Sequence, residues 1–217
     1  MFLIFEGIDG SGKSTHIKKL YELLSKMGVD VDISKGDLAS KEAPIASLFT
    51  KLLKGEQFPS NELSLLMKMA NLKYLYEYNA TSQIYIFDRH IFSIYSDMYA
   101  LGVDIDKYDD LFKMFNKIDR VYYFNTSPYD TYKRKEGKVT YAETGGPTYS
   151  VNGEITKDNF IKFQNDIKKG FELGLSKYVD PAKIVQLEGT NSIEENFAII
   201  EADIISLLES AKGINDK

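Results

Sequence analysis

Two short segments of the chain carry residues whose types and spacing fit the chemistry of phosphate groups. The first, Gly7-Ile-Asp-Gly-Ser-Gly-Lys13-Ser14, follows the pattern G-x-x-x-x-G-K-[ST]. Its glycines let successive backbone N–H groups point into one concavity, and a following helix adds its unpaired donors. In such a cradle Lys13 would reach the β and γ phosphates of a nucleotide, and Ser14 would ligate magnesium. The alternative is a glycine-rich turn that holds no ligand.

The second segment places a charged pair, Asp88-Arg89, directly after the apolar run 84–87. An aspartate there can hold a magnesium shell or polarise an attacking group, and an arginine can clamp a transferring phosphoryl group. Alternatively, Asp88 caps the next helix and pairs with Arg89. This segment alone leaves both interpretations open.

The elements that must position these residues follow from the hydrophobic pattern. Short apolar runs bounded by turn residues predict five strands, at 2–6, 29–33, 84–87, 121–124 and 184–187. Apolar residues recurring at three and four predict helices at 13–27, 42–54, 61–78, 106–116, 156–178 and 193–210. The alternation predicts an α/β fold: a mostly parallel sheet with helices on both faces and the ligand at the carboxyl ends of the strands.

One interval interrupts this alternation. Residues 136–153 hold four glycines and a proline without clear periodicity. We expect a single domain over 1–217, with a mobile lid at about 134–153.

Composition restricts the classes of function. With 217 residues the chain can bury a substantial core, and with no cysteine and two histidines it offers little for disulfides or for zinc. A formal net charge of −5 argues against nucleic acid as a partner. No segment has the length of a membrane span, and the N-terminus does not look like a secretory signal. We therefore expect a cytoplasmic protein that acts away from the membrane.

Taken together, the motifs resemble those of the thymidylate kinase family. The matching segments are the N-terminal FEGIDGSGKST, FDRHIFS after the third strand, Ser127-Pro-Tyr-Asp-Thr-Tyr-Lys-Arg134, and Gly189-Thr-Asn-Ser-Ile-Glu-Glu195. The resemblance implies a three-layer P-loop NTPase fold with a central five-stranded parallel sheet, and a nucleoside monophosphate kinase that transfers the γ-phosphate of ATP to dTMP, giving dTDP. It also implies magnesium, a homodimer and a lid that closes over the phosphates. Alternatives are a deoxynucleoside or other nucleotide kinase, and a nucleotide-binding protein that has lost transferase activity.

The resemblance also assigns residues to these roles. ATP would be bound by Gly7, Gly10, Ser11, Gly12, Lys13, Ser14, Thr15, Gly189, Thr190 and Asn191. The acceptor would contact Asp9, Arg89 and Ser93, and the metal would contact Ser14 and Asp88. The expected catalytic residues are Lys13, Asp88, Arg89 and Arg134. Arg134 is included because Gly10 leaves the cradle without an arginine, so the lid must supply the cation, with Lys133, Lys135 and Lys138 able to assist. We expect its loss to lower turnover more than ATP affinity.

The chain departs from the family pattern on the acceptor side. Leu72 stands where relatives have a base-reading arginine, and Met98 where they have an amide. We therefore expect an apolar wall of Leu66, Met67, Leu72 and Met98, and looser discrimination between bases, unless backbone groups or residues such as Asp97 and Asn71 take over the reading. An arginine-containing segment of relatives is replaced by residues 34–41, so either the arginine contact to the acceptor phosphate is missing or a lysine, at 35, 41 or 51, replaces it as a point charge. His16 is expected to be packed or solvated rather than catalytic, and His90 is as likely to touch the ligand as not.

Overall fold

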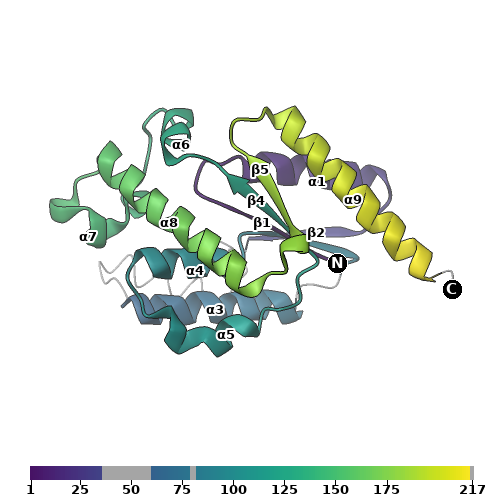
Figure 1. Ribbon diagram of the computed structural model, residues 1–217, viewed down its shortest axis with the longest axis horizontal. Helices are drawn as coiled ribbons and strands as arrows, with labels where there is room; N and C mark the ends of the chain where they lie inside the picture. Colours follow the sequence, from purple (N-terminus) through teal and green to yellow (C-terminus); the bar gives the residue numbers. More distant parts are fainter. Residues whose placement is uncertain (36–59, 79–81, 216–217) are drawn as a thin grey trace.

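A five-stranded parallel sheet forms the centre of the molecule (Figure 1). The computed structural model describes residues 1–35, 60–78 and 82–215. The strand order is β2-β3-β1-β4-β5, and every pairing is parallel. The strands are β1 (Phe2–Gly7), β2 (Val31–Lys35), β3 (Ile84–Asp88), β4 (Arg120–Asn125) and β5 (Ile184–Glu188). The predicted fold class is confirmed, with each strand within two residues of its expected start.

Helices cover both faces of this sheet (Figure 1). One face is covered by α1 (Lys13–Lys26) and α9 (Ile193–Asn215). The other is covered by α3 (Asn61–Tyr78), α4 (Ile91–Ala100), α5 (Asp109–Lys113) and α8 (Lys157–Tyr178). Two shorter helices, α6 (Pro128–Arg134) and α7 (Gly146–Tyr149), lie between β4 and α8 in the chain.

The alternation of side chains along the strands builds two cores. In β1, Phe2 and Ile4 pack beneath α3, α4 and α8, whereas Leu3 and Phe5 pack beneath α1 and α9. The same period of two recurs in β3 and β4, since neighbouring side chains in a strand point to opposite faces. Both faces are buried, so the strands are apolar throughout.

Three helical expectations need correction or qualification. The helix expected at 106–116 is a 3-10 turn, Ile105–Tyr108, followed by the short α5. Helices α4 and α6 were not expected from periodicity. The helix expected at 42–54 lies outside the described residues.

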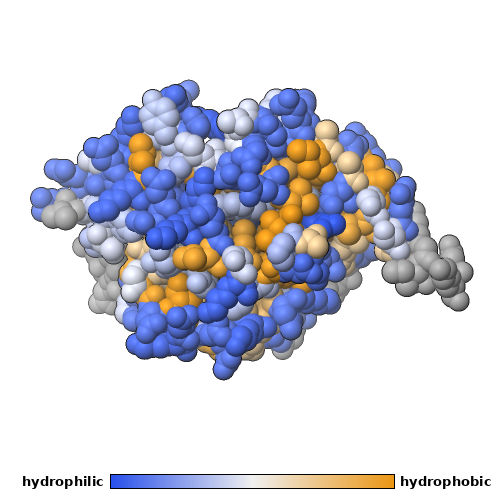
Figure 2. Space-filling model, viewed as in Figure 1, coloured by the Kyte–Doolittle hydropathy of each residue, from blue (hydrophilic) through white to orange (hydrophobic). Residues whose placement is uncertain are grey.

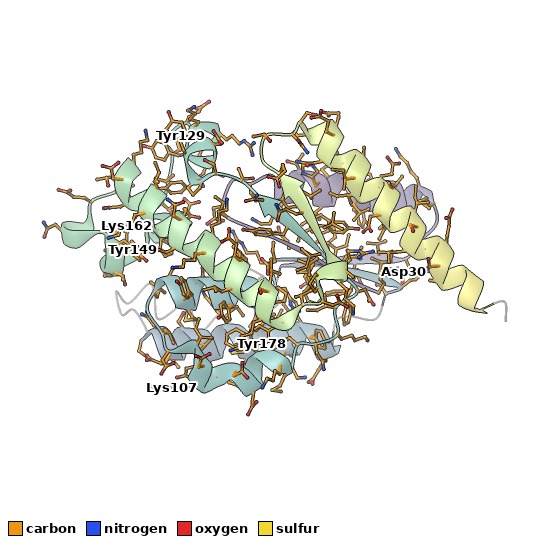
Figure 3. The ribbon with its side chains drawn as sticks, in the orientation of Figure 1. Asp30, Lys107, Tyr129, Tyr149, Lys162 and Tyr178 are labelled. Carbon is orange, nitrogen blue, oxygen red and sulfur yellow. The ribbon has the colours of Figure 1, made fainter. Side chains whose placement is uncertain are left out.

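The interval 136–153 forms short helical turns instead of the irregular loop that its composition predicted. A 3-10 turn at Ala142–Thr144, α7 and a second 3-10 turn at Val151–Gly153 follow one another. Tyr149 lies beside α8 (Figure 3), with its hydroxyl 2.7 Å from the Ala100 carbonyl oxygen and 2.9 Å from the Asp166 carboxylate. The mobility of the expected lid, residues 134–153, which we call the lid segment, stays a prediction.

Surface character differs between the elements on the face shown in Figure 2. Polar residues cover α6 and α8, and apolar residues gather between α8 and α9, over β5. Within the described ranges, no helix has both the length and the apolar character needed to cross a membrane.

Candidate active site

The loop between β1 and α1 forms a cradle with helix-terminal amides at its base. Gly12 precedes α1 with φ 103°, and Gly7 has φ 149°, conformations that favour glycine. A Cβ at Gly7 would lie 2.9 Å from the Phe124 carbonyl oxygen, so β4 also requires glycine there. The cradle borders a cavity of about 460 Å³, which we call the P-loop cavity. Its lining comprises Asp9, Gly10, Ser11, Gly12, Lys13, Ser14, Thr15, Asp88, Arg89, Arg134 and Lys135.

Lys13 is held inside the cradle by oxygen atoms. Its Nζ donates to the carbonyl oxygens of Gly7 at 2.7 Å and Ile8 at 3.0 Å, and lies 3.4 Å from Ser11 Oγ. Burial, together with the nearby Arg89 guanidinium, lowers the pKa of Lys13. Phosphate oxygens would restore the favourable environment for its charge, so this ammonium is suited to bind an anion.

Ser14 and Asp88 meet where a metal ion would be expected. Ser14 Oγ donates to Asp88 Oδ2 at 3.3 Å across the start of α1 and the end of β3. In the described part of the chain, no three His, Cys, Asp or Glu side chains cluster to hold a metal. A hydroxyl and one carboxylate fit Mg²⁺, which is usually bound by one or two carboxylates, substrate phosphates and water.

Arg89 occupies a strained position at the border of two cavities. Its φ of 76° lies in the left-handed region, which non-glycine residues seldom adopt and which often marks functional sites. Its guanidinium forms an ion pair with Asp9 and donates to Ser93 Oγ at 3.2 Å. Burial would raise the pKa of Asp9, but Arg89, with help from two lysines, lowers it overall. The pair therefore stays ionised.

Glu6, in β1, holds the backbone that follows Arg89 in place. This fully buried carboxylate accepts hydrogen bonds from the backbone N–H groups of His90 at 2.8 Å and Ser93 at 3.1 Å, and from Ser93 Oγ at 2.5 Å. It thereby satisfies unpaired donors at the start of α4. Burial raises the pKa of Glu6, against the lowering effects of the Ser93 hydrogen bond and Arg89. The end of β1 thus holds the start of α4 in place.

A second cavity, of about 530 Å³, lies among α3, α4, α8 and the lid segment; we call it the helix cavity. Arg89, Ser93, Asp97 and Leu101 line it at every fourth residue. The remaining lining residues are Ile8, Asp9, Asn61, Ser64, Lys68, His90, Ile94, Ala142, Glu143, Gly145, Gly146, Pro147, Thr148, Phe163, Gln164 and Ile167. Asp9 and Arg89 line both cavities and so form their shared wall.

The expected apolar wall of the acceptor site is not assembled here. The described residues that line the helix cavity include none of Leu66, Met67, Leu72 and Met98. Leu72 and Met98 are fully buried in the core, and Leu66 is exposed. The cavity instead presents Ser64 and Lys68 from α3 and Asp97 from α4, which lies one residue from Met98. Sequence reasoning named Asp97 only as a possible substitute reader, and its spacing by fours from Arg89 is the sequence signal that favours it over Met98.

The lid segment contributes two cations to the P-loop cavity. Arg134 Nη2 donates to the Gly189 carbonyl oxygen at 2.6 Å, which links the cavity to the turn after β5. The Lys135 side chain lies over the cradle: a Cβ at Gly10 would be 3.3 Å from its stem. Its ammonium forms an ion pair with Glu143, a residue of the helix cavity. From the sequence, Lys135 was expected only to assist Arg134.

The turn after β5 lies beside the P-loop cavity rather than in its described lining. Gly189 packs so closely on Thr126 that a Cβ would lie 2.8 Å from the Thr126 Cα. Asn191 Nδ2 donates to Asn196 Oδ1 at 3.1 Å, at the start of α9. Thr190 lies between Gly189 and Asn191 in the sequence. The hydrogen bond from Arg134 to the Gly189 carbonyl oxygen joins this turn to the P-loop cavity.

The two histidines are both packed. His16 Nδ1 lies 2.9 Å from the Gly12 carbonyl oxygen, and its Nε2 lies 3.2 Å from the Ile193 carbonyl oxygen. His90 borders the helix cavity, but its ring is buried among aromatic rings. Burial lowers the pKa of His90 to about 3, which keeps the imidazole neutral.

A parallel α/β sheet with a glycine-rich cradle, a buried lysine and a second cavity across an Asp–Arg wall defines a nucleoside monophosphate kinase of the P-loop class. Residues 5–200 match the sequence model of the family described as Thymidylate kinase. The chain belongs to the thymidylate kinase family.

Individual relatives agree with this membership. The chain is 26% identical to a probable thymidylate kinase of Sulfurisphaera tokodaii over 201 residues, covering 89% of this chain and 90% of the relative. It is 32% identical to a thymidylate kinase of Chlorobium phaeobacteroides over 183 residues, covering 79% and 80%. It is 27% identical to a thymidylate kinase of Caldanaerobacter subterraneus subsp. tengcongensis over 188 residues, covering 79% and 85%.

Proposed function

We propose that this protein transfers the γ-phosphate of ATP to dTMP, giving ADP and dTDP. The observation that carries the proposal is the shared wall: Asp9 and Arg89 line both the P-loop cavity and the helix cavity. ATP bound by the cradle would place its γ-phosphate at that wall. A monophosphate in the helix cavity would meet it from the other side, as transfer between two bound nucleotides requires.

The cradle residues bind and polarise the donor. Backbone N–H groups of the loop and the start of α1 hold the phosphates, while Lys13 balances the charge that develops on the transferring group. Ser14 and Asp88 would hold Mg²⁺, which supplies charge neutralisation across the β and γ phosphates when bound.

At the shared wall Arg89 would exchange its ion pair with Asp9 for a two-pronged contact to the acceptor phosphate. An oxygen of that phosphate forms a bond to the γ-phosphorus as the bond from phosphorus to the β–γ bridging oxygen breaks. Lys135, which lies over Gly10, is placed to meet the negative charge of the transferring group. Its partner Glu143 belongs to the lid segment, so closure and cation placement are linked.

A phosphorylated acceptor fits this site better than a free nucleoside. The helix cavity begins at the partly buried guanidinium of Arg89, which a neutral nucleoside would leave without an anionic partner other than Asp9. The homodimer and the cytoplasmic location implied earlier stay predictions, and the lysines at 41 and 51 lie outside the described residues.

Release of ADP from ATP and magnesium, measured with dTMP, dUMP, dCMP, dGMP and thymidine in parallel, tests the proposal. We expect ADP release with dTMP and none above background with thymidine. Faster release with thymidine would identify a nucleoside kinase. ATP binding without release with any acceptor would identify a nucleotide-binding protein.

A further inference from the structure

An ion pair occupies the wall of the helix cavity away from the cradle. Lys68 Nζ of α3 and Asp97 Oδ2 of α4 are 2.6 Å apart, and the side chains are 20% and 34% exposed. A partly exposed pair of this kind adds little to stability, typically below about 1 kcal/mol. Both side chains line the cavity, where a bound ligand can reach them.

The pair lies at the correct depth for the base of a bound nucleotide. Arg89 precedes α4, which begins at Ile91, and Asp97 lies six residues further, so at a rise of about 1.5 Å per residue it lies roughly 9 Å along the helix axis from Ile91. Beyond it, Asn61 Nδ2 donates to the Leu101 carbonyl oxygen at 3.3 Å and joins α3 to α4. A monophosphate anchored at Arg89 therefore reaches the ion pair with its base.

The side chains around the pair suit a flat, neutral ring. Ile94, Phe163 and Ile167 are buried apolar residues of the same lining, from α4 and α8. The ammonium has three N–H donors, and the carboxylate accepts at several lone pairs, so each keeps bonding capacity after pairing with the other. Together they present a donor beside an acceptor, with no net charge.

We propose that Lys68 and Asp97 read the edge of the acceptor base, and that this edge belongs to a 4-keto pyrimidine. Lys68 donates to O4 of the ring, and Asp97 accepts from N3–H. Cytosine reverses this edge: its amino group would face the ammonium, and its bare N3 would face the carboxylate. Thymine and uracil share the keto edge, so the pair does not separate them. The proposal rests on the proposed function, which puts a nucleoside monophosphate in this cavity.

Because dUMP and dCMP differ only at this edge, they are the probes. Binding of each is measured by calorimetry, and phosphate transfer to each is measured as kcat/KM. We expect the wild type to favour dUMP by about 10- to 100-fold, the range for a paired base edge.

Three variants test the roles of the two charges. In Asp97→Asn the amide side chain can donate or accept, so the preference for dUMP over dCMP should fall towards one. The double variant Lys68→Asp with Asp97→Lys keeps an ion pair and reverses its polarity, so it should favour dCMP. The control is Lys73→Met, which breaks a second ion pair of α3, with Glu77 at 2.9 Å, outside the described lining of the helix cavity. It should leave the ratio unchanged.

Equal weakening of both nucleotides in Asp97→Asn, with an unchanged ratio, would show that the pair only joins two helices and would overturn the proposal. A wild type that binds both equally, or prefers dCMP, would overturn it as well. If the wild type binds dUMP in preference to dCMP but transfers no phosphate, the base-reading role is supported and the proposed transfer fails.

Discussion

At the scale of single residues, Lys13 is the side chain on which the proposed transfer depends most. It is buried at the cradle with its ammonium directed at loop carbonyls. Lys13→Ala should reduce turnover at least about a hundredfold, because preorganised charge stabilisation of this kind is worth several kcal/mol. Steady-state ADP release with saturating ATP measures it.

Lys18→Ala is the matched control, since Lys18 lies on the same helix with its side chain 80% exposed. It should keep full turnover. Near-normal turnover in a folded Lys13→Ala protein would remove the cradle lysine from the mechanism.

How far residues could be predicted depended on the kind of signal. The cradle positions followed from a motif with fixed spacing, and the structure gathers them around one cavity. The base-facing residues depended on which face of a buried helix turns inward. Successive helix residues differ by about 100°, so Met98 enters the core while the adjacent Asp97 lines the cavity.

At the scale of elements, the lid segment offers two cations with different contacts. Arg134 bonds to the Gly189 carbonyl oxygen, whereas Lys135 lies over Gly10. We expect Lys135→Ala to lower kcat with a smaller effect on the apparent constant for ATP, because its contact to the transferring group strengthens in the transition state. Arg134→Ala should chiefly raise the apparent constant for ATP, whereas the sequence alone led us to expect a loss of turnover.

Initial rates over a range of ATP concentrations separate the two effects, and Lys138→Ala, an exposed lid lysine paired with Glu136, serves as control. If Arg134→Ala lowered kcat and Lys135→Ala did not, the sequence-based assignment of the lid cation would stand and ours would fail.

The contact between α4 and α8 sets the width of the helix cavity. A Cβ at Gly170 would lie 2.6 Å from the Ser96 Cα, so Gly170→Ala must displace backbone. At Gly174 the nearest atom is in the Tyr95 ring, at 3.0 Å, and a side chain can shift. Gly170→Ala should cost roughly 1–3 kcal/mol, or several degrees in Tm, and should raise the KM for the acceptor.

Gly174→Ala should be closer to neutral, because alanine's helix propensity offsets the smaller clash. Thermal melts of both variants and acceptor titrations make the comparison. Equal stability of the two variants would contradict the close-packing argument.

The missed helices show what periodicity can and cannot detect. Eight of the ten residues of α4 are buried, and the polar residues Ser93 and Asp97 line the helix cavity, so the helix has no solvent-facing polar stripe of the kind that an amphipathic pattern detects. In α6 the local signals were present: Ser127 caps the helix by accepting from the Asp130 N–H, and Pro128 follows at the first position. Its seven residues were too few for periodicity to register.

At the scale of the whole molecule, His90 connects core packing to pH. In the described part of the chain neither ring nitrogen has a hydrogen-bond partner, and burial lowers its pKa from 6.5 to about 3. Above pH 6.5 the imidazole is neutral in both folded and unfolded states. Below it the unfolded state takes up the proton first, so stability falls as the pH falls from 6.5 towards 3.

His90→Phe should remove this component, up to about 1.4 kcal/mol per pH unit. Urea unfolding of both proteins between pH 4 and pH 8 measures it. Glu6, whose pKa is raised, acts in the opposite direction, and the comparison cancels it. Parallel pH profiles for the two proteins would show that His90 gains its proton in the folded state too.

The wall formed by Asp9 and Arg89 has a thermodynamic consequence for the molecule as a whole. A nucleotide that draws Arg89 away from Asp9 alters the surface of both cavities at once. The two substrates should then be heterotropic effectors of each other, and linkage requires the factor to be the same in both directions. One ratio compares acceptor affinity with and without a bound non-hydrolysable ATP analogue. It should equal the ratio of analogue affinities measured with and without bound acceptor.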